Sequence, residues 1–348
     1  MLRKSRQISV GGVHMGKGAP ITVQSMLNEP AHDIEASVKQ ALKLEAAGCD
    51  IIRAAVPDME AVRLIYRLKS EVKVPIVADI HFNYRLALES VAAGVDKIRI
   101  NPGNIGDEGR IKAVANACKA AGVPIRVGVN SGSLEKSVLA RYGAPTAEAL
   151  FESGMYHIKL LNKFDFYDIV LSLKASDTQK MFDAYTFAAS HCDYPLHLGV
   201  TEAGTKRMGL MKSAAGIGGL LLSGIGDTIR VSLTDSPIEE VRAGIDLLRS
   251  VGKRNGGVRF VSCPTCGRTR IDLISLANRA ETLLKDCKKD ITVAIMGCAV
   301  NGPGEAKEAD VGIAGGDGCG LLFKKGEIVK KVPEQQLLSV LLEEIEKM

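Results

Sequence analysis

The feature that most constrains the fold is an alternation between apolar runs and amphipathic stretches over the first ~250 residues. The apolar runs, each typical of a buried strand, are PITVQSM, DIIRAAVP, PIVADIH, DKIRINPG, PIRVGVN, DIVLSLKAS, LHLGVTEAG and DTIRVSLT. Several of the amphipathic stretches end at a glycine directly before the next apolar run, which is a common way for a helix to stop. Eight strand–helix units in succession predict a (β/α)8 barrel of the TIM type.

A second, smaller α/β domain is predicted after the barrel. Residues 252–257 are rich in glycine and charge and predict a linker, which places the barrel at residues 1–252 and the second domain at 258–348. An amphipathic helix is expected over 270–289, followed by a strand in ITVAIMG. The domain closes with an expected hairpin in LLFKKGEIVKKV and a helix from Pro333 onward.

The composition is that of a globular protein, with 46% apolar and 24% charged residues. The net charge of +5 is mild and no basic run is interleaved with aromatic residues, so a nucleic-acid partner is not expected. No apolar run approaches the length that spans a membrane, and the basic N-terminus lacks the apolar segment of a secretory signal. Eight cysteines without such a signal predict reduced thiols in a cytoplasm.

The strongest chemical signal lies in the second domain, between VSCPTCGR and IMGCAVNGPGEA. Cys263 and Cys266 form a Cys-x-x-Cys pair, a spacing that brings two thiolates into one pocket as a metal requires. Cys298 follows the strand expected in ITVAIMG, so strand, cysteine pair, helix, strand and third cysteine bring three sulfur atoms together. The alternative is a pair of packed thiols beside a surface turn.

The fourth ligand has several candidates. Cys287 and Cys319 are available by count, and four cysteines would suit zinc or an iron–sulfur cluster equally. Glu305 is the other candidate, because the Asn-Gly-Pro-Gly turn before it can fold back toward Cys298. Three thiolates and a carboxylate favour an iron–sulfur cluster with one exchangeable iron, since a hard oxygen ligand is readily displaced by a substrate oxygen.

Polar side chains gather at the carboxyl ends of the barrel strands, where TIM barrels carry their active sites. Those ends carry Gln24, Arg53, Asp79, His81, Arg99, Asn101, Arg126, Asn130, Lys174, Glu202, Arg230 and Ser232. Five strands therefore end on a cation, and each cation could pair with a nearby carboxylate. Because five cations at one mouth would repel one another, a polyanionic ligand is the better explanation, and a diphosphate fits the number of donors.

Three of these strand-end residues are acids or a histidine. Glu202 is expected to serve as a proton donor or hydrogen-bond partner near the reacting carbons, or else to pair with Arg230 or Lys174. Asp79 and His81 lie two apart on one strand and are expected to orient each other, with His81 donating a hydrogen bond near the ligand. The remaining histidines, His14, His32, His157, His191 and His197, form no constellation in the sequence and are expected to pack or to face solvent.

Together these motifs resemble the 4-hydroxy-3-methylbut-2-enyl diphosphate synthases, the reductive iron–sulfur enzymes of the non-mevalonate isoprenoid pathway, in their bacterial two-domain form. The resemblance extends from SCPTCGR and GCAVNGPGEA to VQSM, ADIHFN, KIRINPGNIG, VGVNSGSLE, LGVTEAG and GIGDTIRVSLT. It implies a [4Fe–4S] cluster held by Cys263, Cys266, Cys298 and Glu305. It also implies substrate contacts at Arg53, His81, Arg99, Arg126, Asn130, Lys174, Arg230 and Ser232.

The expected function is the reductive opening and dehydroxylation of 2-C-methyl-D-erythritol 2,4-cyclodiphosphate to 4-hydroxy-3-methylbut-2-enyl diphosphate. By resemblance, reduced flavodoxin or ferredoxin supplies the electrons. Two alternatives are a phosphate-binding barrel aldolase or transferase with a structural zinc domain, and a metal-dependent binding module fused to a barrel without activity.

The linker also predicts an assembly. The eighth barrel helix, from about Pro237 to Val251, runs antiparallel to its strand and therefore ends opposite the active-site mouth. The six-residue linker spans at most about 20 Å, too little for the cluster domain to pass a helix of similar length and cover its own mouth. A head-to-tail homodimer, in which each cluster domain closes the partner's barrel, is expected.

Overall fold

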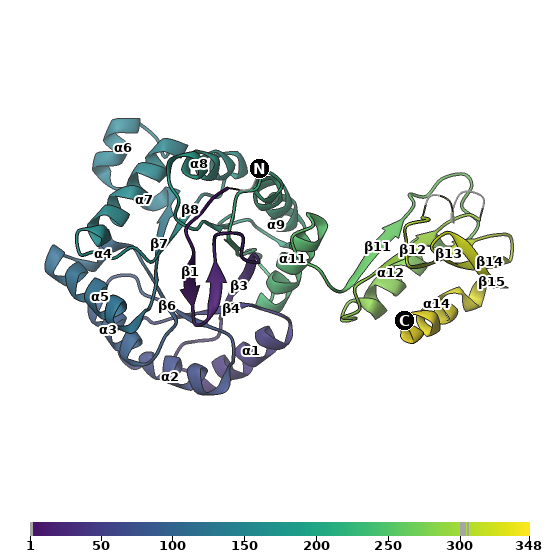
Figure 1. The fold of residues 1–348 in the computed structure, drawn as a ribbon, viewed down its shortest axis with the longest axis horizontal. Coiled ribbons are helices and arrows are strands. Elements are labelled where there is room, and N and C mark those ends of the chain that lie inside the picture. Colours follow the sequence, from purple (N-terminus) through teal and green to yellow (C-terminus); the bar gives the residue numbers. More distant parts are fainter. Residues whose placement is uncertain (1–2, 300–303, 305) are drawn as a thin grey trace. The chain divides into compact units, whose positions relative to one another are not determined.

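The structure is a computed structural model, and it describes residues 3–299, 304 and 306–348. The chain divides into two compact units, Met1–Arg254 and Asn255–Met348, and each is described separately (Figure 1). No helix among the described residues is long and apolar enough to cross a membrane.

The first unit is built around a ring of eight parallel strands in the order β8-β7-β6-β5-β4-β3-β10-β9. The strands are β3 (Thr22–Met26), β4 (Ile51–Ala55), β5 (Ile76–Asp79), β6 (Lys97–Ile100), β7 (Ile125–Asn130), β8 (Ile169–Lys174), β9 (His197–Leu198) and β10 (Thr228–Ile229). A parallel bridge between Leu171 and Leu196 joins β8 to the start of β9, which closes the ring. The predicted (β/α)8 barrel is confirmed.

Helices surround the ring, and several begin at a side-chain cap. They are α1 (Ile34–Ala46), α2 (Val62–Glu71), α3 (Tyr84–Ala92), α4 (Pro102–Ile105), α5 (Glu108–Ala121), α6 (Lys136–Tyr142), α7 (Ala147–Asn162), α8 (Thr178–His191), α9 (Lys206–Ser213), α10 (Gly219–Leu222) and α11 (Pro237–Ser250). The long helical region expected before Asn162 is two helices, because Gly143 adopts a left-handed conformation that ends α6. A π-helical turn, Ala214–Gly218, joins α9 to α10.

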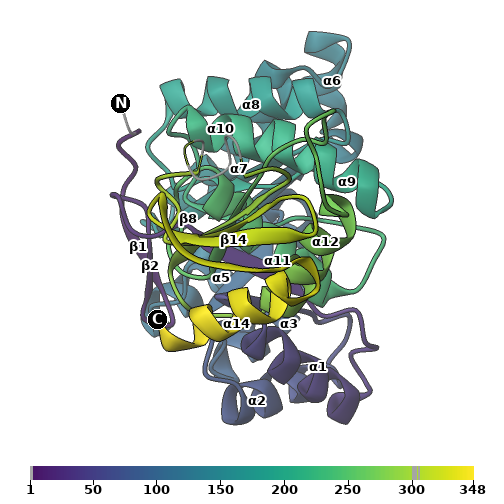
Figure 2. The ribbon, with the colours of Figure 1, turned by 90° about the vertical axis from the view of Figure 1, so that its right-hand side faces the viewer.

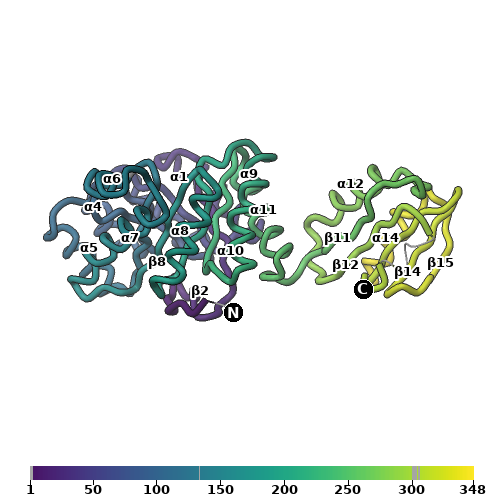
Figure 3. The backbone as a smooth tube through the Cα atoms, turned by 90° about the horizontal axis from the view of Figure 1, so that it is seen from above, coloured from purple at the N-terminus to yellow at the C-terminus, as the bar shows by residue number. Residues whose placement is uncertain are grey.

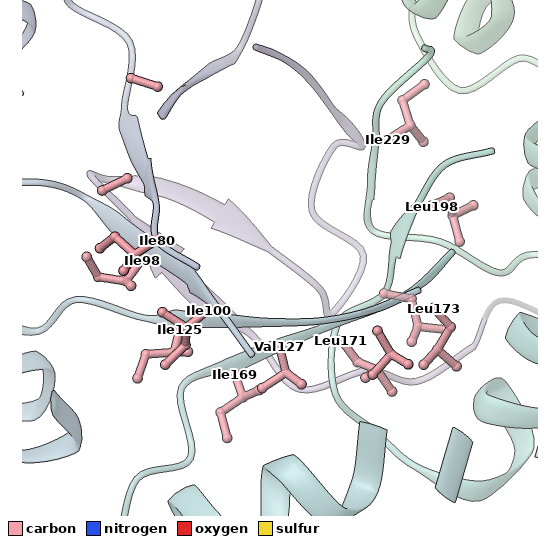
Figure 4. Packing of buried hydrophobic residues seen from close by; sticks show 14 of the residues in the cluster. Ile80, Ile98, Ile100, Ile125, Val127, Ile169, Leu171, Leu173, Leu198 and Ile229 are labelled. Atoms are coloured by element: carbon pink, nitrogen blue, oxygen red, sulfur yellow. The ribbon is translucent and has the colours of Figure 1, made fainter. Parts of the chain in front are cut away.

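The barrel has an apolar layer on its outside and an apolar plug at one end. Outward-facing residues of neighbouring strands, such as Ile98 and Val127, pack fully buried between sheet and helices (Figure 4). An N-terminal hairpin, β1 (Ile8–Val10) and β2 (Val13–Met15), lies at one end of the barrel (Figure 3). Its apolar side chains form a buried cluster with inward-facing Ile51, Val77 and Val170 near the amino ends of the strands. The carboxyl ends are therefore the end at which a ligand can enter.

The second unit is a five-stranded sheet in the order β11-β12-β13-β14-β15. Its strands are β11 (Val258–Ser262), β12 (Ile291–Met296), β13 (Val311–Gly315), β14 (Cys319–Lys324) and β15 (Glu327–Pro333). The first three are parallel, and β14 and β15 form the antiparallel hairpin that the sequence predicted. Its described residues include two helices of ten or more residues, α12 (Leu273–Leu284) and α14 (Leu337–Lys347), both labelled in Figure 2.

Candidate active site

A polar cavity of about 100 Å³ opens at the carboxyl ends of the barrel strands. Its lining residues are Arg53, Arg99, Arg126, Gly128, Asn130, Ser172, Lys174, Thr201, Arg230 and Ser232. The structure thus brings together all of the predicted substrate-binding residues except His81, whose side chain is 59% exposed. Ser172 and Thr201 are lining residues that sequence reasoning missed.

The alternation of side chains along each strand explains how polar groups reach the cavity. In β7, the residues at 125, 127 and 129 are apolar and lie in the core beneath the helices, so Arg126, Gly128 and Asn130 face the barrel axis. Two glycines leave room for the cations: a Cβ at Gly128 would lie 3.0 Å from Nε of Arg99, and one at Gly199 would lie 3.1 Å from Nζ of Lys174. The cavity is therefore shaped around these two side chains.

Asp79 is the carboxylate at the centre of the cations. It lies 3.1 Å from Nη1 of Arg99 and 3.5 Å from Nη2 of Arg53, and Nε2 of His81 lies 3.5 Å away. Burial works to raise the pKa of Asp79, but the charge of Arg53 and the hydrogen bond with His81 outweigh it and hold that pKa below its usual range. Asp79 therefore remains ionised and fixes two of the cavity's guanidinium groups.

The carboxylates do not neutralise all of the cations. Arg230 lies 3.4 Å from Glu240, whereas Nε and Nη1 of the buried Arg126 have no hydrogen-bond partner among the described residues. Burial, followed by the charges of Arg126 and Arg230, lowers the pKa of Lys174 well below its usual value. The pKa of Arg53 is lowered to about 10, first by burial. An excess of buried positive charge is costly without an anion, so the site favours a polyanionic ligand.

Lys97 is a further buried cation, and sequence reasoning missed it. It opens β6 two residues before Arg99, which places both side chains on the inner face of the barrel. Its side chain is fully buried, and Nζ has no hydrogen-bond partner within the described part of the chain. Burial and then the charges of Arg126 and Arg53 lower the pKa of Lys97 well below its usual value. Lys97 could have been predicted from its spacing, because residues two apart on a strand share a face and Arg99 was already assigned to the inner face.

Glu202 has an uncommon backbone conformation. Its φ of 51° lies in the left-handed region, which costs a residue other than glycine about 1–2 kcal/mol. Such conformations concentrate at functional sites, and Glu202 directly follows Thr201, which lines the cavity. Glu202 forms no ion pair with any residue that the structure describes, whereas Arg230 pairs with Glu240. The alternative in which Glu202 pairs with Arg230 or Lys174 is therefore not seen.

The second unit brings two of the predicted metal ligands to one edge of its sheet. Because β11 and β12 are parallel neighbours, Cys263 and Cys298 emerge at the same carboxyl edge. Sγ of Cys263 accepts a hydrogen bond from the backbone N–H of Gly297 at 3.2 Å, a contact that stabilises a thiolate. Cys266 is exposed, and its N–H donates to Oγ1 of Thr269 at 3.1 Å.

Only part of the predicted metal-ligand set lies among the described residues. Glu305 lies outside the described residues, and no three His, Cys, Asp or Glu side chains within the described ranges are placed to hold a metal ion. Cys287 packs against the apolar core of the second unit, and Cys319 opens β14. The shared edge and the N–H···S hydrogen bond at Cys263 suit soft thiolate ligands for a metal.

Comparisons with known proteins cover both units. Residues 5–245 match the GcpE TIM-barrel domain, and residues 259–347 match the GcpE protein C-terminal domain. The chain belongs to the GcpE family. A relative from Caldanaerobacter subterraneus subsp. tengcongensis is 56% identical over 348 residues, which cover 100% of this chain and 98% of the relative. One from Clostridium perfringens is 53% identical over 344 residues, which cover 99% of each chain. Both are named 4-hydroxy-3-methylbut-2-en-1-yl diphosphate synthase (flavodoxin).

The family and the enzyme class predicted from the motifs are therefore confirmed for this GcpE protein. Solved structures add the fold alone. A dihydropteroate synthase from Coxiella burnetii has a TM-score of 0.53 at 14% identity, with 71% of this chain and 98% of that chain covered. A 3-dehydroquinate dehydratase from Geobacillus kaustophilus has a TM-score of 0.52 at 14% identity, with 72% and 99% covered. At this identity neither supports the alternative of an aldolase or transferase.

Proposed function

We propose that this chain converts 2-C-methyl-D-erythritol 2,4-cyclodiphosphate to 4-hydroxy-3-methylbut-2-enyl diphosphate. The reaction consumes two electrons and two protons, breaks the ring and releases one hydroxyl group as water. The observation that carries the proposal is the cavity at the barrel mouth, where cations outnumber the carboxylates that pair with them. A cyclic diphosphate has the charge and the number of acceptor oxygens to satisfy such a cavity.

The barrel, residues 1–252, is proposed to bind the substrate. The proposed contacts are Arg53, His81, Arg99, Arg126, Asn130, Lys174, Arg230 and Ser232. When the ring opens, the bond between carbon and a phosphate oxygen breaks, and negative charge develops on that oxygen. Cations that are already fixed by the barrel stabilise this charge without reorganising at the moment of reaction. Asp79 holds Arg53 and Arg99 in place for this role.

Glu202 is the proposed catalytic acid. Its carboxyl group lies on the residue after Thr201 in the cavity lining, and its backbone is held in a strained conformation. A proton delivered to the departing hydroxyl group converts a poor leaving group into water. No carboxylic acid is among the described residues that line the cavity, and Glu202 directly follows one of them, Thr201.

The second domain, residues 258–348, is proposed to hold a [4Fe–4S] cluster through Cys263, Cys266, Cys298 and Glu305. When bound, the cluster supplies the two electrons one at a time at low potential. The cysteines position it at the carboxyl edge of the sheet, and the N–H of Gly297 stabilises the charge on Cys263. Reduced flavodoxin is the proposed electron donor, as in the names of the relatives. None of the eight cysteines, all of which lie among the described residues, forms a disulfide, in keeping with the proposed cytoplasmic location.

The test is an absorption spectrum of the protein purified without oxygen. An iron–sulfur cluster gives a brown protein that dithionite bleaches, whereas the alternative with structural zinc gives a colourless one. Addition of the cyclic diphosphate to the reduced protein should then reoxidise it. A colourless, zinc-loaded protein that is folded would refute the proposal.

A head-to-tail homodimer is proposed as the active form. Helix α11 has 14 residues and is about 21 Å long, and few residues separate it from β11. Because so short a linker is not expected to let the cluster domain pass this helix, the domain is proposed to close the barrel of the partner. Two inactive variants, Glu202→Gln and Cys298→Ser, test the arrangement after subunit exchange. Activity should return, because the mixed dimer combines an intact barrel with an intact cluster domain. Verified exchange without activity would place each complete site within one chain.

A further inference from the structure

His157, which the sequence led us to expect to pack or to face solvent, connects the loops that follow two cavity-lining strands. It lies in the middle of α7, and its side chain is fully buried. One loop follows β6, which carries Arg99, and the other follows β7, which carries Arg126 and Asn130. The two strands are parallel neighbours, so both loops begin at the carboxyl end of the barrel, where the strands carry the cavity-lining Arg99 and Asn130.

The first contact is with the loop after β6. The backbone N–H of Gly103 donates to Nδ1 of His157 at 3.2 Å, and it also donates to Oδ1 of Asn101 at 3.2 Å. Asn101 is the cap of the short helix α4. The main chain at Gly103 lies close to the ring: a Cβ at this position would be 2.5 Å from Cε1 of His157, so only glycine fits. The conformation of this loop is therefore set against the imidazole.

The second contact is with the loop after β7. Nε2 of His157 lies 2.5 Å from Oε1 of Glu135, the residue that precedes α6. Glu135 follows Asn130 by five positions, so its carboxylate belongs to a loop that begins at the cavity lining. The contact with the ring therefore fixes the position of the Glu135 carboxylate in this loop.

The two contacts indicate which tautomer the imidazole of His157 adopts. Because Nδ1 accepts a hydrogen bond from a backbone N–H, the neutral ring carries its proton on Nε2, the atom that lies 2.5 Å from Oε1 of Glu135. Burial lowers the pKa of His157, although the charge of Glu135 acts to raise it. The neutral tautomer accepts the hydrogen bond from Gly103 and keeps its proton on the nitrogen beside Glu135, whereas a ring protonated on Nδ1 would direct a second donor at the N–H of Gly103.

We propose that His157 is a positioning residue, which links the loops after β6 and β7 in the arrangement that binds the polyanionic substrate. The inference rests on the proposed function, since it requires an anion at the barrel mouth. It assigns the ring no contact with the substrate. Its effect is expected in substrate affinity, through the placement of Arg99 and Asn130.

The test compares three substitutions of His157 that differ in which of its two contacts they can keep. In His157→Asn, the amide oxygen can replace Nδ1 as acceptor for Gly103. In His157→Gln, the longer amide can replace Nε2 as donor to Glu135. His157→Ala loses both contacts. His191→Ala is the control, because His191 lies on the outer helix α8 and is exposed.

The readouts are the dissociation constant of inorganic pyrophosphate and of the cyclic diphosphate by calorimetry on oxidised protein, together with kcat, KM and the melting temperature. We expect His157→Ala to weaken both affinities at least tenfold. The affinities of His157→Asn and His157→Gln should lie between those of His157→Ala and wild type. The His191→Ala control should bind both anions as wild type does. If His157→Ala does not fold, a loss of threefold or more in both of the other variants is the supporting result. Wild-type affinity in the folded variants, with only the melting temperature lowered, would overturn the proposal.

A second pair of variants tests the contact with Gly103. Gly103→Ala alone should weaken pyrophosphate binding, since its Cβ clashes with the ring, whereas Gly103→Ala combined with His157→Ala should bind no more weakly than His157→Ala alone. Unchanged binding in the Gly103→Ala protein would contradict the inference. A wild-type protein that binds neither anion would instead overturn the proposed function, so the two failures are distinguishable.

Discussion

Replacement of Asp79 by Asn should destabilise the barrel and yet strengthen its affinity for a simple polyanion. Asp79 has 3% of its side chain exposed and is the carboxylate that pairs with both Arg53 and Arg99. Asparagine keeps the size and one acceptor oxygen but removes the charge. Two guanidinium groups, of side chains 11% and 14% exposed, then lose their shared counter-charge.

The expected loss follows from the cost of leaving a buried charge without its partner, about 3–5 kcal/mol of unfolding free energy. In a unit of this size 1 kcal/mol shifts the melting temperature by roughly 2–4 °C, so a decrease of roughly 6–20 °C is expected. The carboxylate's contribution is present above the unfolded-state pKa of about 3.9 and is lost as the pH falls through the lower folded-state value. The difference between wild type and Asp79→Asn should therefore shrink in acid.

The assay is thermal unfolding at neutral pH with and without inorganic pyrophosphate. Because the variant's cavity carries one more net positive charge, pyrophosphate should bind more tightly and raise its melting temperature further than that of wild type. Turnover should fall, since the guanidinium groups lose their fixed positions. Asp193→Asn is the matched control: its pair with Arg6 is at the surface, with the Asp193 side chain 57% exposed. That change should cost at most about 1 kcal/mol. An Asp79→Asn protein that melts with wild type, or that binds pyrophosphate more weakly, would refute this reasoning.

Three further outcomes follow from the proposed roles. Arg126→Ala and Lys174→Ala should each weaken substrate binding by about 1.5–3 kcal/mol and leave the cluster spectrum intact; unchanged affinity in calorimetry would show that these cations serve the fold alone. Glu202→Gln should keep substrate binding and lose turnover, and a variant with wild-type kcat would remove Glu202 from the mechanism. Glu305→Ala should lose or destabilise the cluster, as judged by iron content and absorbance, while Cys319→Ser keeps it; a full, active cluster in Glu305→Ala would exclude Glu305 as a ligand.

The barrel was predictable because its signal is repeated in the sequence. Each strand is an apolar run, and the polar residue at its end is visible as a break in that run, so the sequence alone assigns Arg53, Arg99 and Arg126 to one mouth. The N-terminal hairpin was missed because its strands of three residues are too short to show a period. The strands β9 and β10 are shorter than expected, because only two residues of each form backbone hydrogen bonds with neighbouring strands.

Contacts between distant residues were beyond the sequence. His157 depends on Glu135 and on Gly103, 54 residues away, and no local pattern connects the three. The Glu240 carboxylate that pairs with Arg230 is also invisible in the strand pattern, because it lies on α11. The cation excess follows from the strand ends, but its partial neutralisation by Asp79 and Glu240 depends on how the side chains meet in three dimensions.

The central claim, that this chain reduces a cyclic diphosphate with electrons from a cluster, is tested most directly by one turnover. The protein with its reconstituted cluster is mixed under nitrogen with 2-C-methyl-D-erythritol 2,4-cyclodiphosphate and a measured amount of dithionite that supplies two electrons per cluster, and the products are measured by mass spectrometry. We predict one 4-hydroxy-3-methylbut-2-enyl diphosphate for every two electrons supplied, with the protein reoxidised once the reductant is consumed. Fully reduced protein that binds the cyclic diphosphate but returns it unchanged, with no reoxidation, would contradict the claim.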